Sequence, residues 1–191
     1  MTDPKMECLS GLRPLGPRVA AKKYLQDAGP SDYRASALWR NFVRLVDYAI
    51  REYELARQLI EGFSREPASK GLNAPICASG HFETVLTTIV RASKHAGGLE
   101  KLLASSQSDA DLRLQDEVGQ LSVDTDGRIR SMRNAIHHLD ERILKGKIPA
   151  DQNCVLRPGE KGLELGKHSI SYDDICCTLK QLYRTAKVLA R

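Results

Sequence analysis

The sequence lacks the features of a membrane protein, a secreted protein or a protein stabilised by a bound metal ion. No apolar run approaches the roughly 18 residues that a transmembrane helix needs, and residues 1–16 lack the apolar core of a signal peptide. The 5 cysteines are odd in number and show no C-x-x-C spacing, unlike a disulfide framework or a zinc site. We therefore expect a cytoplasmic protein with reduced thiols, no membrane association, no metal and no cofactor.

Aromatic residues and motifs for phosphate or nucleophile chemistry are also scarce. Aromatics make up 5% of the 191 residues, so a stacking platform for single-stranded bases is not evident. The sequence has no glycine-rich phosphate loop, no G-x-S-x-G and no H-E-x-x-H, which disfavours the enzyme classes that these motifs define. The charge is basic: 29 Lys and Arg against 24 Asp and Glu leave a net charge of +5. This balance permits anionic partners without requiring them.

The domain organisation follows from an ordinary composition, with 41% hydrophobic and 28% charged residues, which suits one folded core. Residues 1–31 contain four prolines and three glycines, so a long regular element cannot pass through them. We predict a partly flexible N-terminal arm over residues 1–31, with a short helix at 18–26 as one option. The folded domain is predicted over residues 32–191.

Apolar residues recur at three- and four-residue steps in four segments of the folded domain, a pattern typical of amphipathic helices. In the second segment, the pair Gly97–Gly98 leaves two alternatives open: a break or kink at the pair, or a helix that continues through Leu103. The prolines and glycine of residues 66–79 predict a loop before this segment. The predicted helices cover residues 32–62, residues 79–103, residues 119–145 and a last segment that begins at Ser171.

A different pattern precedes the last helix. Residues 154–170, with a turn at Pro158–Gly159, predict a small β-hairpin or an extended loop. Ser171, followed three residues later by Asp174, predicts a helix N-cap. The expected fold is all-α, an up-and-down bundle of four to five helices with this small β-hairpin or extended loop before the last helix.

The third predicted helix carries the densest set of polar groups. At ~100° per residue, Ile129, Met132, Ile136, Leu139 and Ile143 fall on one side, which we assign to the core. The opposite side gathers Arg130, Asn134, His137 and Glu141, and its two flanks hold Arg133 and His138.

This polar face suits phosphodiester chemistry. Arginine presents a planar fork of donors to phosphate oxygens and stays charged. Histidine, with an ordinary pKa of ~6.5, can take a proton from a hydroxyl or give one to a leaving oxygen. Such a face is equally compatible with a solvated helix surface whose side chains pair at helical spacing. The residues alone leave these two interpretations open.

The segment Arg133-Asn134-Ala135-Ile136-His137-His138 resembles the R-x(4–6)-H motif of the HEPN superfamily, in which a polar residue commonly follows the arginine. Domains of that superfamily are helical bundles of about this size with the motif on a late helix. The resemblance implies a metal-independent endoribonuclease, usually a homodimer whose two motifs line one cleft. It also suggests the toxin or effector of a toxin–antitoxin, defence or stress module, with RNA as substrate and a neutralising protein as partner.

Site residues follow from the same resemblance. Arg133 would contact the scissile phosphate, His138 would be the general base or acid, and Asn134 would orient one of them. His137 and Arg130 are auxiliary candidates, because Arg130 to His137 also satisfies the motif and leaves the choice of histidine open. Independently of the resemblance, Arg91 on the second predicted helix is a further auxiliary candidate, because it lies four residues before His95 and the two could form a second phosphate-contacting pair.

Two alternatives accompany this prediction. Many HEPN domains lack nuclease activity, so the chain is alternatively a noncatalytic module that binds nucleic acid, a nucleotide or a partner protein. A purely structural helical dimer is the third interpretation. In some toxin members of the superfamily, a nucleotidyltransferase modifies a tyrosine that lies two residues after the motif histidine. Here Asp140 occupies that position, so this regulation is not expected.

Overall fold

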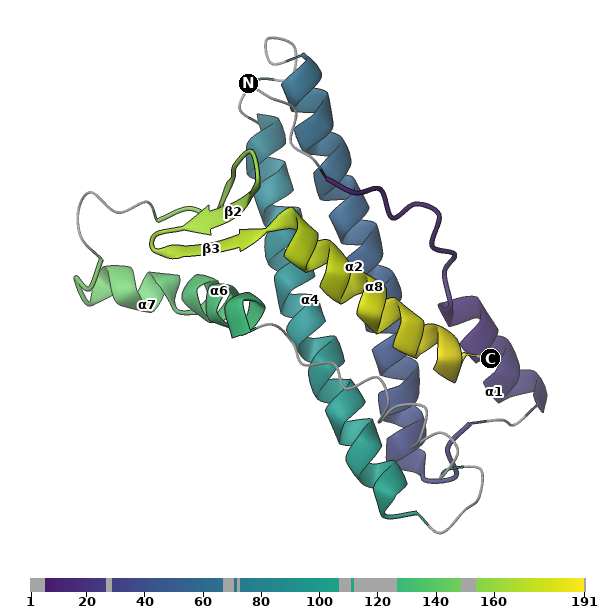
Figure 1. Cartoon of the computed structure of the whole chain (residues 1–191). Helices are drawn as coiled ribbons and strands as arrows, with labels where there is room; N and C mark the ends of the chain where they lie inside the picture. Colours follow the sequence, from purple (N-terminus) through teal and green to yellow (C-terminus); the bar gives the residue numbers. More distant parts are fainter. Residues whose placement is uncertain are drawn as a thin grey trace. The chain divides into compact units, whose positions relative to one another are not determined.

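The computed structural model describes residues 6–26, 29–66, 71, 73–106, 111, 127–148 and 154–190. Within these ranges the chain forms six helices and three short strands (Figure 1). This confirms the predicted mostly helical fold with a small β element before the last helix. No helix of the described segments has the length and apolarity to cross a bilayer. The helices are α1 (Gly16–Gln26), α2 (Tyr33–Arg65), α4 (Asn73–Ala104), α6 (Gly127–His137), α7 (Leu139–Leu144) and α8 (Tyr172–Leu189), and the strands are β1 (Arg157–Pro158), β2 (Gly162–Leu165) and β3 (His168–Ser171).

The chain divides into two compact units. Unit 1 comprises Met1–Gly11, Ile50–Thr87 and Asp126–Cys177, and unit 2 comprises Leu12–Ala49, Thr88–Thr125 and Thr178–Arg191. The long helices α2, α4 and α8 each contribute residues to both units. Each unit has its own packing and is described separately.

The core of unit 1 is built around three buried aromatic rings. Phe82 of α4 makes an edge contact with Tyr53 of α2, with ring centroids 6.4 Å apart. On its other side Phe82 stacks on Tyr172 of α8, with centroids 5.6 Å apart. The Tyr172 hydroxyl donates to the Gly159 carbonyl at 2.9 Å. The aromatic cluster therefore ties the first turn of α8 to the turn before β2.

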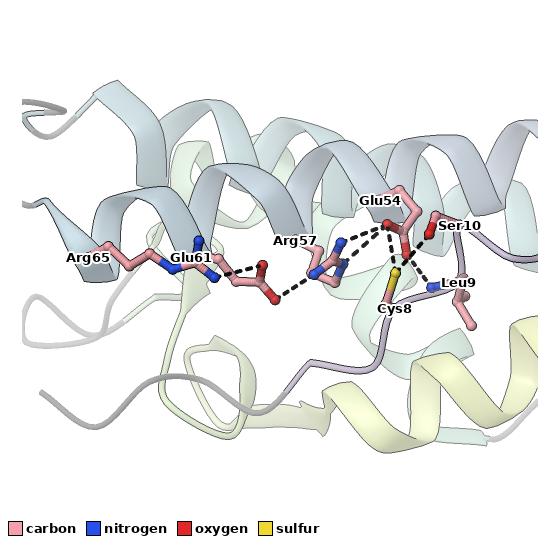
Figure 2. Close-up of polar contacts among 7 residues, drawn as sticks. All are labelled: Cys8, Leu9, Ser10, Glu54, Arg57, Glu61 and Arg65. Atoms are coloured by element: carbon pink, nitrogen blue, oxygen red, sulfur yellow. Dashed lines mark hydrogen bonds and ion pairs between the residues drawn. The ribbon is translucent and has the colours of Figure 1, made fainter.

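In unit 1 the N-terminal segment is held on α2 by a buried carboxylate. Glu54, 8% exposed, accepts the backbone N–H of Leu9 and lies 3.0 Å from Arg57. Arg57 also pairs with Glu61 at 2.6 Å, and Figure 2 shows these contacts in a row along the helix. Burial opposes the charge of Arg57, but hydrogen bonds to Glu54 and Glu61 outweigh it and raise the pKa of the guanidinium.

In unit 2 the carboxylate of Asp47 holds the start of α1. It accepts the backbone N–H groups of Leu15 and Gly16, which would otherwise lack partners at a helix N-terminus. The buried indole of Trp39 donates to the Leu189 carbonyl at 3.2 Å. Gly29, with φ +124°, lies so close to this ring that a Cβ would approach it to 2.7 Å. The described part of residues 1–31 thus makes specific contacts with α2, and α1 corresponds to the short helix predicted at residues 18–26.

The second long helix begins earlier than predicted. α4 starts at Asn73 and includes Pro75 in its first turn, where the missing proline N–H needs no helical partner. The prediction of a loop through Ser79 was therefore wrong. α4 also continues through Gly97 and Gly98 without a break. A Cβ at Gly98 would lie 3.1 Å from the Leu38 side chain, so close approach of α2 accounts for this glycine.

The third predicted helix is two helices in the structure. The prediction over residues 119–145 was wrong at His138, which separates α6 from α7; residues 119–126 lie outside the described ranges. The predicted end before Gly146 is confirmed. Gly146 has φ +59°, and the N–H groups of Gly146 and Lys147 donate to the carbonyls of Ile143 and Arg142. This pairing is a Schellman motif, in which glycine accommodates the left-handed backbone.

The predicted apolar stripe holds only in α6. Ile129 and Met132 are fully buried, whereas Ile143 is 48% exposed and Ile136 and Leu139 are half-buried. No residue of α7 is buried. Because the helix is interrupted at His138, the periodicity of α6 does not carry its core face into α7.

The strands form an antiparallel sheet in the order β1-β2-β3. Arg157 faces Glu164 across the first pair, and Leu163 faces Ile170 across the second. The hairpin prediction is confirmed in kind, but Pro158, which was predicted to lie in the turn, lies in the first strand. The predicted cap at Ser171 is confirmed, since its hydroxyl accepts the Asp174 N–H at 3.1 Å.

Candidate functional site

One face of α6 is anchored within unit 1. Ile129 and Met132 have no exposed surface, and α6 packs against β3, as Figure 1 shows. The Ser131 hydroxyl lies 3.1 Å from Nδ1 of His168 on β3. At the start of the helix, Arg128 pairs with Asp174 of α8 at 3.0 Å. These contacts fix how α6 is rotated and therefore which residues it presents to solvent.

The motif residues lie on the other side of this helix. Arg130, Asn134, His137 and His138 are exposed, and Arg133 is half-buried. Arg133 Nη1 donates to Asn134 Oδ1 at 3.2 Å. This contact brings together the arginine and the polar residue that follows it, as expected from the motif.

The two arginines of this face have no carboxylate partner in the described part of the chain. Neither Arg130 nor Arg133 makes an ion pair there, in contrast to Arg128, which pairs with Asp174. An unpaired guanidinium keeps its donors available for an anionic ligand, and phosphate oxygens match its fork. The face therefore presents two cationic groups that can contact phosphate.

The two histidines are neighbours at the junction between the helices. The His137 and His138 rings meet edge to face, with centroids 5.1 Å apart. Nδ1 of His138 lies 3.3 Å from Oε2 of Glu141, and Glu141 also accepts the Lys145 ammonium group. Hydrogen bonds from Lys145 and His138 lower the pKa of Glu141. With its Nδ1 hydrogen donated to Glu141, His138 presents Nε2 as the nitrogen able to accept a proton.

The structure groups the predicted site residues in two pairs. Arg133 donates a hydrogen bond to Asn134, and the His137 and His138 rings contact each other, whereas no hydrogen bond within the described ranges joins Arg133 to either histidine. The pairing of His138 with Glu141 was not predicted from the sequence. The signal for it was present, because an acid three residues after a histidine lies on the same side of a helix.

Arg91, the remaining auxiliary candidate, belongs to unit 2, whereas the motif belongs to unit 1. Its neighbourhood contains His95 and Arg44. Burial, followed by the charges of Arg91 and Arg44, lowers the pKa of His95. Nδ1 of His95 is buried without a hydrogen-bond partner in the described residues. Arg91 is therefore part of a separate basic cluster.

Within the segments that the structure describes, no three His, Cys, Asp or Glu side chains come together as metal ligands do. All five cysteines are free thiols. No protein-family model, no curated protein and no solved structure matches the chain.

Proposed function

We propose that the chain is a cytoplasmic, metal-independent endoribonuclease of the HEPN type, acting as a homodimer. The observation that supports it best is the solvent-facing side of α6, where Arg130 and Arg133 lack carboxylate partners in the described residues beside the exposed His138. We propose further that it serves as the toxin or effector of a defence or stress module and is held in check by a neutralising protein.

The chemistry uses the nucleophile that RNA carries. His138 Nε2 removes the proton of a ribose 2′-hydroxyl, whose oxygen attacks the adjacent phosphorus. The bond from phosphorus to the 5′ oxygen breaks, and that oxygen takes a proton from a second acid or from water. The products are a 2′,3′-cyclic phosphate and a 5′-hydroxyl. Arg133 stabilises the negative charge that grows on the phosphate oxygens.

A homodimer suits the arrangement within one chain. Arg133 is held by Asn134 and His138 by Glu141, so the two main groups are oriented separately. Two copies of the motif facing one cleft would place the arginine of one copy and the histidine of the other on the same phosphate. Binding would be mainly to the RNA backbone and would weaken strongly with salt.

The decisive experiment is RNA cleavage in the presence of EDTA. Purified protein is incubated with structured and unstructured RNA, and the ends of the products are mapped. Arg133→Ala and His138→Ala are compared with Arg184→Ala, a control that removes another exposed arginine. We expect cleavage by the wild type and the control, with cyclic phosphate ends, and a loss of about 10²-fold or more in both motif variants.

Three other outcomes contradict the nuclease. Equal cleavage by all four proteins would identify a contaminating enzyme. Tight RNA binding without cleavage would instead support the noncatalytic module, and neither binding nor cleavage would leave the structural dimer as the interpretation.

A further inference from the structure

A groove of about 450 Å³ lies in unit 1 between the first turns of α4 and residues 155–158, which lead into β1. Its volume is within the range of ligand-binding pockets, roughly 300–1,000 Å³. The surface of the groove is mostly apolar, and Ile76 on α4 and Val155 on the facing segment line it. Gly80 also lines the groove, and a Cβ there would meet no atom within 4 Å.

The groove exposes apolar side chains that water does not favour. Ile76 is 66% exposed and Val155 is 63% exposed. Among the described residues of unit 1, Leu144 of α7 is 87% exposed, and Ile143 beside it is 48% exposed. The groove and the end of α7 are thus two apolar surfaces in the described part of unit 1, one concave and one on a short helix with no buried residue. Grouped exposed apolar residues commonly mark interaction surfaces.

The carboxyl group of Glu83 lies in the groove and favours an occupant that carries a positive charge. Glu83 lines the groove and is half-buried, and it makes no ion pair in the described residues. Burial raises the pKa of Glu83, which indicates that its charge is poorly solvated and unmatched. Arg157 lines the same groove without pairing to it. An occupant with an apolar surface next to a cation would cover the exposed apolar side chains of the groove and pair with Glu83.

The C-terminal end of α7 has this chemistry. Ile143 and Leu144 are followed by Lys145 and, after the Gly146 turn, by Lys147. Lys145 is engaged by Glu141, whereas Lys147 is exposed and makes no ion pair within the described ranges. Lys147 therefore remains able to pair with a carboxylate on another molecule.

We infer that α7 of one copy docks in this groove of a second copy, with Ile143 and Leu144 against Ile76 and Val155 and with Lys147 beside Glu83. The same contact made in both directions closes a two-fold dimer, because each copy offers one α7 and one groove. The inference rests on the proposed function only for the expectation of a homodimer. Because α7 follows directly after His138, the interface would connect dimer formation to the motif.

Groove filling tests the contact while preserving the fold. Gly80→Leu places a side chain in open space on a helix, and Gly97→Leu is the matched control, because its Cβ also meets no atom within 4 Å on the same helix. By light scattering and sedimentation over a range of concentrations, we expect a wild-type dimer. Gly80→Leu should weaken the dimer by about tenfold or more, the loss of one well-packed contact, and Gly97→Leu should not.

Two further sets of variants test the α7 side of the contact and the charge pair between Lys147 and Glu83. Leu144→Ser should weaken the dimer as Gly80→Leu does, and Tyr33→Ser, which changes a side chain that is 79% exposed in unit 2, should not. Glu83→Lys and Lys147→Glu should each weaken the dimer, and the double variant should restore it. Restoration by charge exchange requires direct pairing and cannot come from misfolding.

The inference is overturned by a wild type that stays monomeric at all concentrations. It is also overturned by a dimer that is insensitive to both Gly80→Leu and Leu144→Ser. A monomer whose melting temperature falls in Gly80→Leu would show that the chain's own segments fill the groove, which likewise contradicts the inference. RNA cleavage is scored separately: a dimer with the expected variant pattern but no nuclease activity would refute the proposed function and leave the interface standing.

Discussion

Nδ1 of His138 lies 3.3 Å from Oε2 of Glu141, which follows three residues later. His138 is the residue that interrupts the helix between α6 and α7. The contact orients one of the two ring nitrogens and leaves the other available. His137, whose ring touches that of His138, has no such hydrogen bond in the described part of the chain. The structure therefore distinguishes two histidines that both satisfy the motif in the sequence, and it favours His138.

This difference predicts the order of two histidine variants. His138→Ala should lower the rate of RNA cleavage by about 10² to 10⁴, the usual contribution of a general acid–base group. His137→Ala should lower it by less, because no hydrogen bond holds that ring in place. Single-turnover cleavage rates of the two variants decide the question, and a larger loss in His137→Ala would assign the motif to Arg130 and His137.

Glu141 should act as a positioning residue for His138. Glu141→Gln keeps the length of the side chain but removes the charge that favours one orientation of the ring. We expect cleavage to slow by about tenfold, less than the loss of the histidine itself, with unchanged RNA affinity. Lys145→Ala is the control, because it removes the other partner of Glu141 and leaves the contact to His138. Weakened RNA binding in Glu141→Gln would argue against a positioning role.

Burial predicts a large stability effect at one residue of the motif region and a small effect at another. Met132→Ala should lower the free energy of unfolding by roughly 2–5 kcal/mol, because the side chain is fully buried. Ile143→Ala should change it by less than about 0.5 kcal/mol, because Ile143 is 48% exposed. Urea denaturation at low protein concentration measures both values apart from any dimer. Equal losses would show that α7 is packed like α6.

Removing the Glu54 carboxylate should destabilise the protein. Glu54→Ala leaves the Leu9 N–H without its acceptor and leaves Arg57 with Glu61 as its remaining carboxylate partner. Hydrogen bonds to charged groups contribute about 1.5–3 kcal/mol, so we expect a loss of about 2 kcal/mol in urea denaturation. Glu100→Ala, which removes an exposed acid of α4, is the control and should have little effect.

Asp32 predicts a dependence of stability on pH. Hydrogen bonds from the Arg34 side chain and the Ala35 N–H lower the pKa of Asp32 to about 2. A carboxyl group with a lower pKa in the folded state stabilises the fold above its unfolded pKa. That contribution is lost as the pH falls from about 4 toward 2. Asp32→Asn keeps a capping side chain but cannot ionise, so its melting temperature should fall less over this interval. Parallel curves for the two proteins would contradict the prediction.

Much of the fold was predictable because it depends on local chemistry. Apolar periodicity identified α2 and α8, the Ser171 hydroxyl capped α8, and Gly146 ended α7 as the Schellman geometry requires. Pro75 misled the prediction of α4, because a proline in a first turn and a proline in a loop look the same in sequence. The Gly97–Gly98 pair was ambiguous until the approach of Leu38 to Gly98 was known.

By itself, the sequence determined the helical class of the fold, the small β element and the position of the R-N-x-x-x-H motif, because periodicity, caps and motifs are properties of neighbouring residues. Only the tertiary structure decided that Met132 is buried while Ile143 is exposed. It also decided that Glu83 lies in an apolar groove. The physical reason is that burial and pairing depend on what segments distant in sequence place against each residue, and helical spacing carries no record of that.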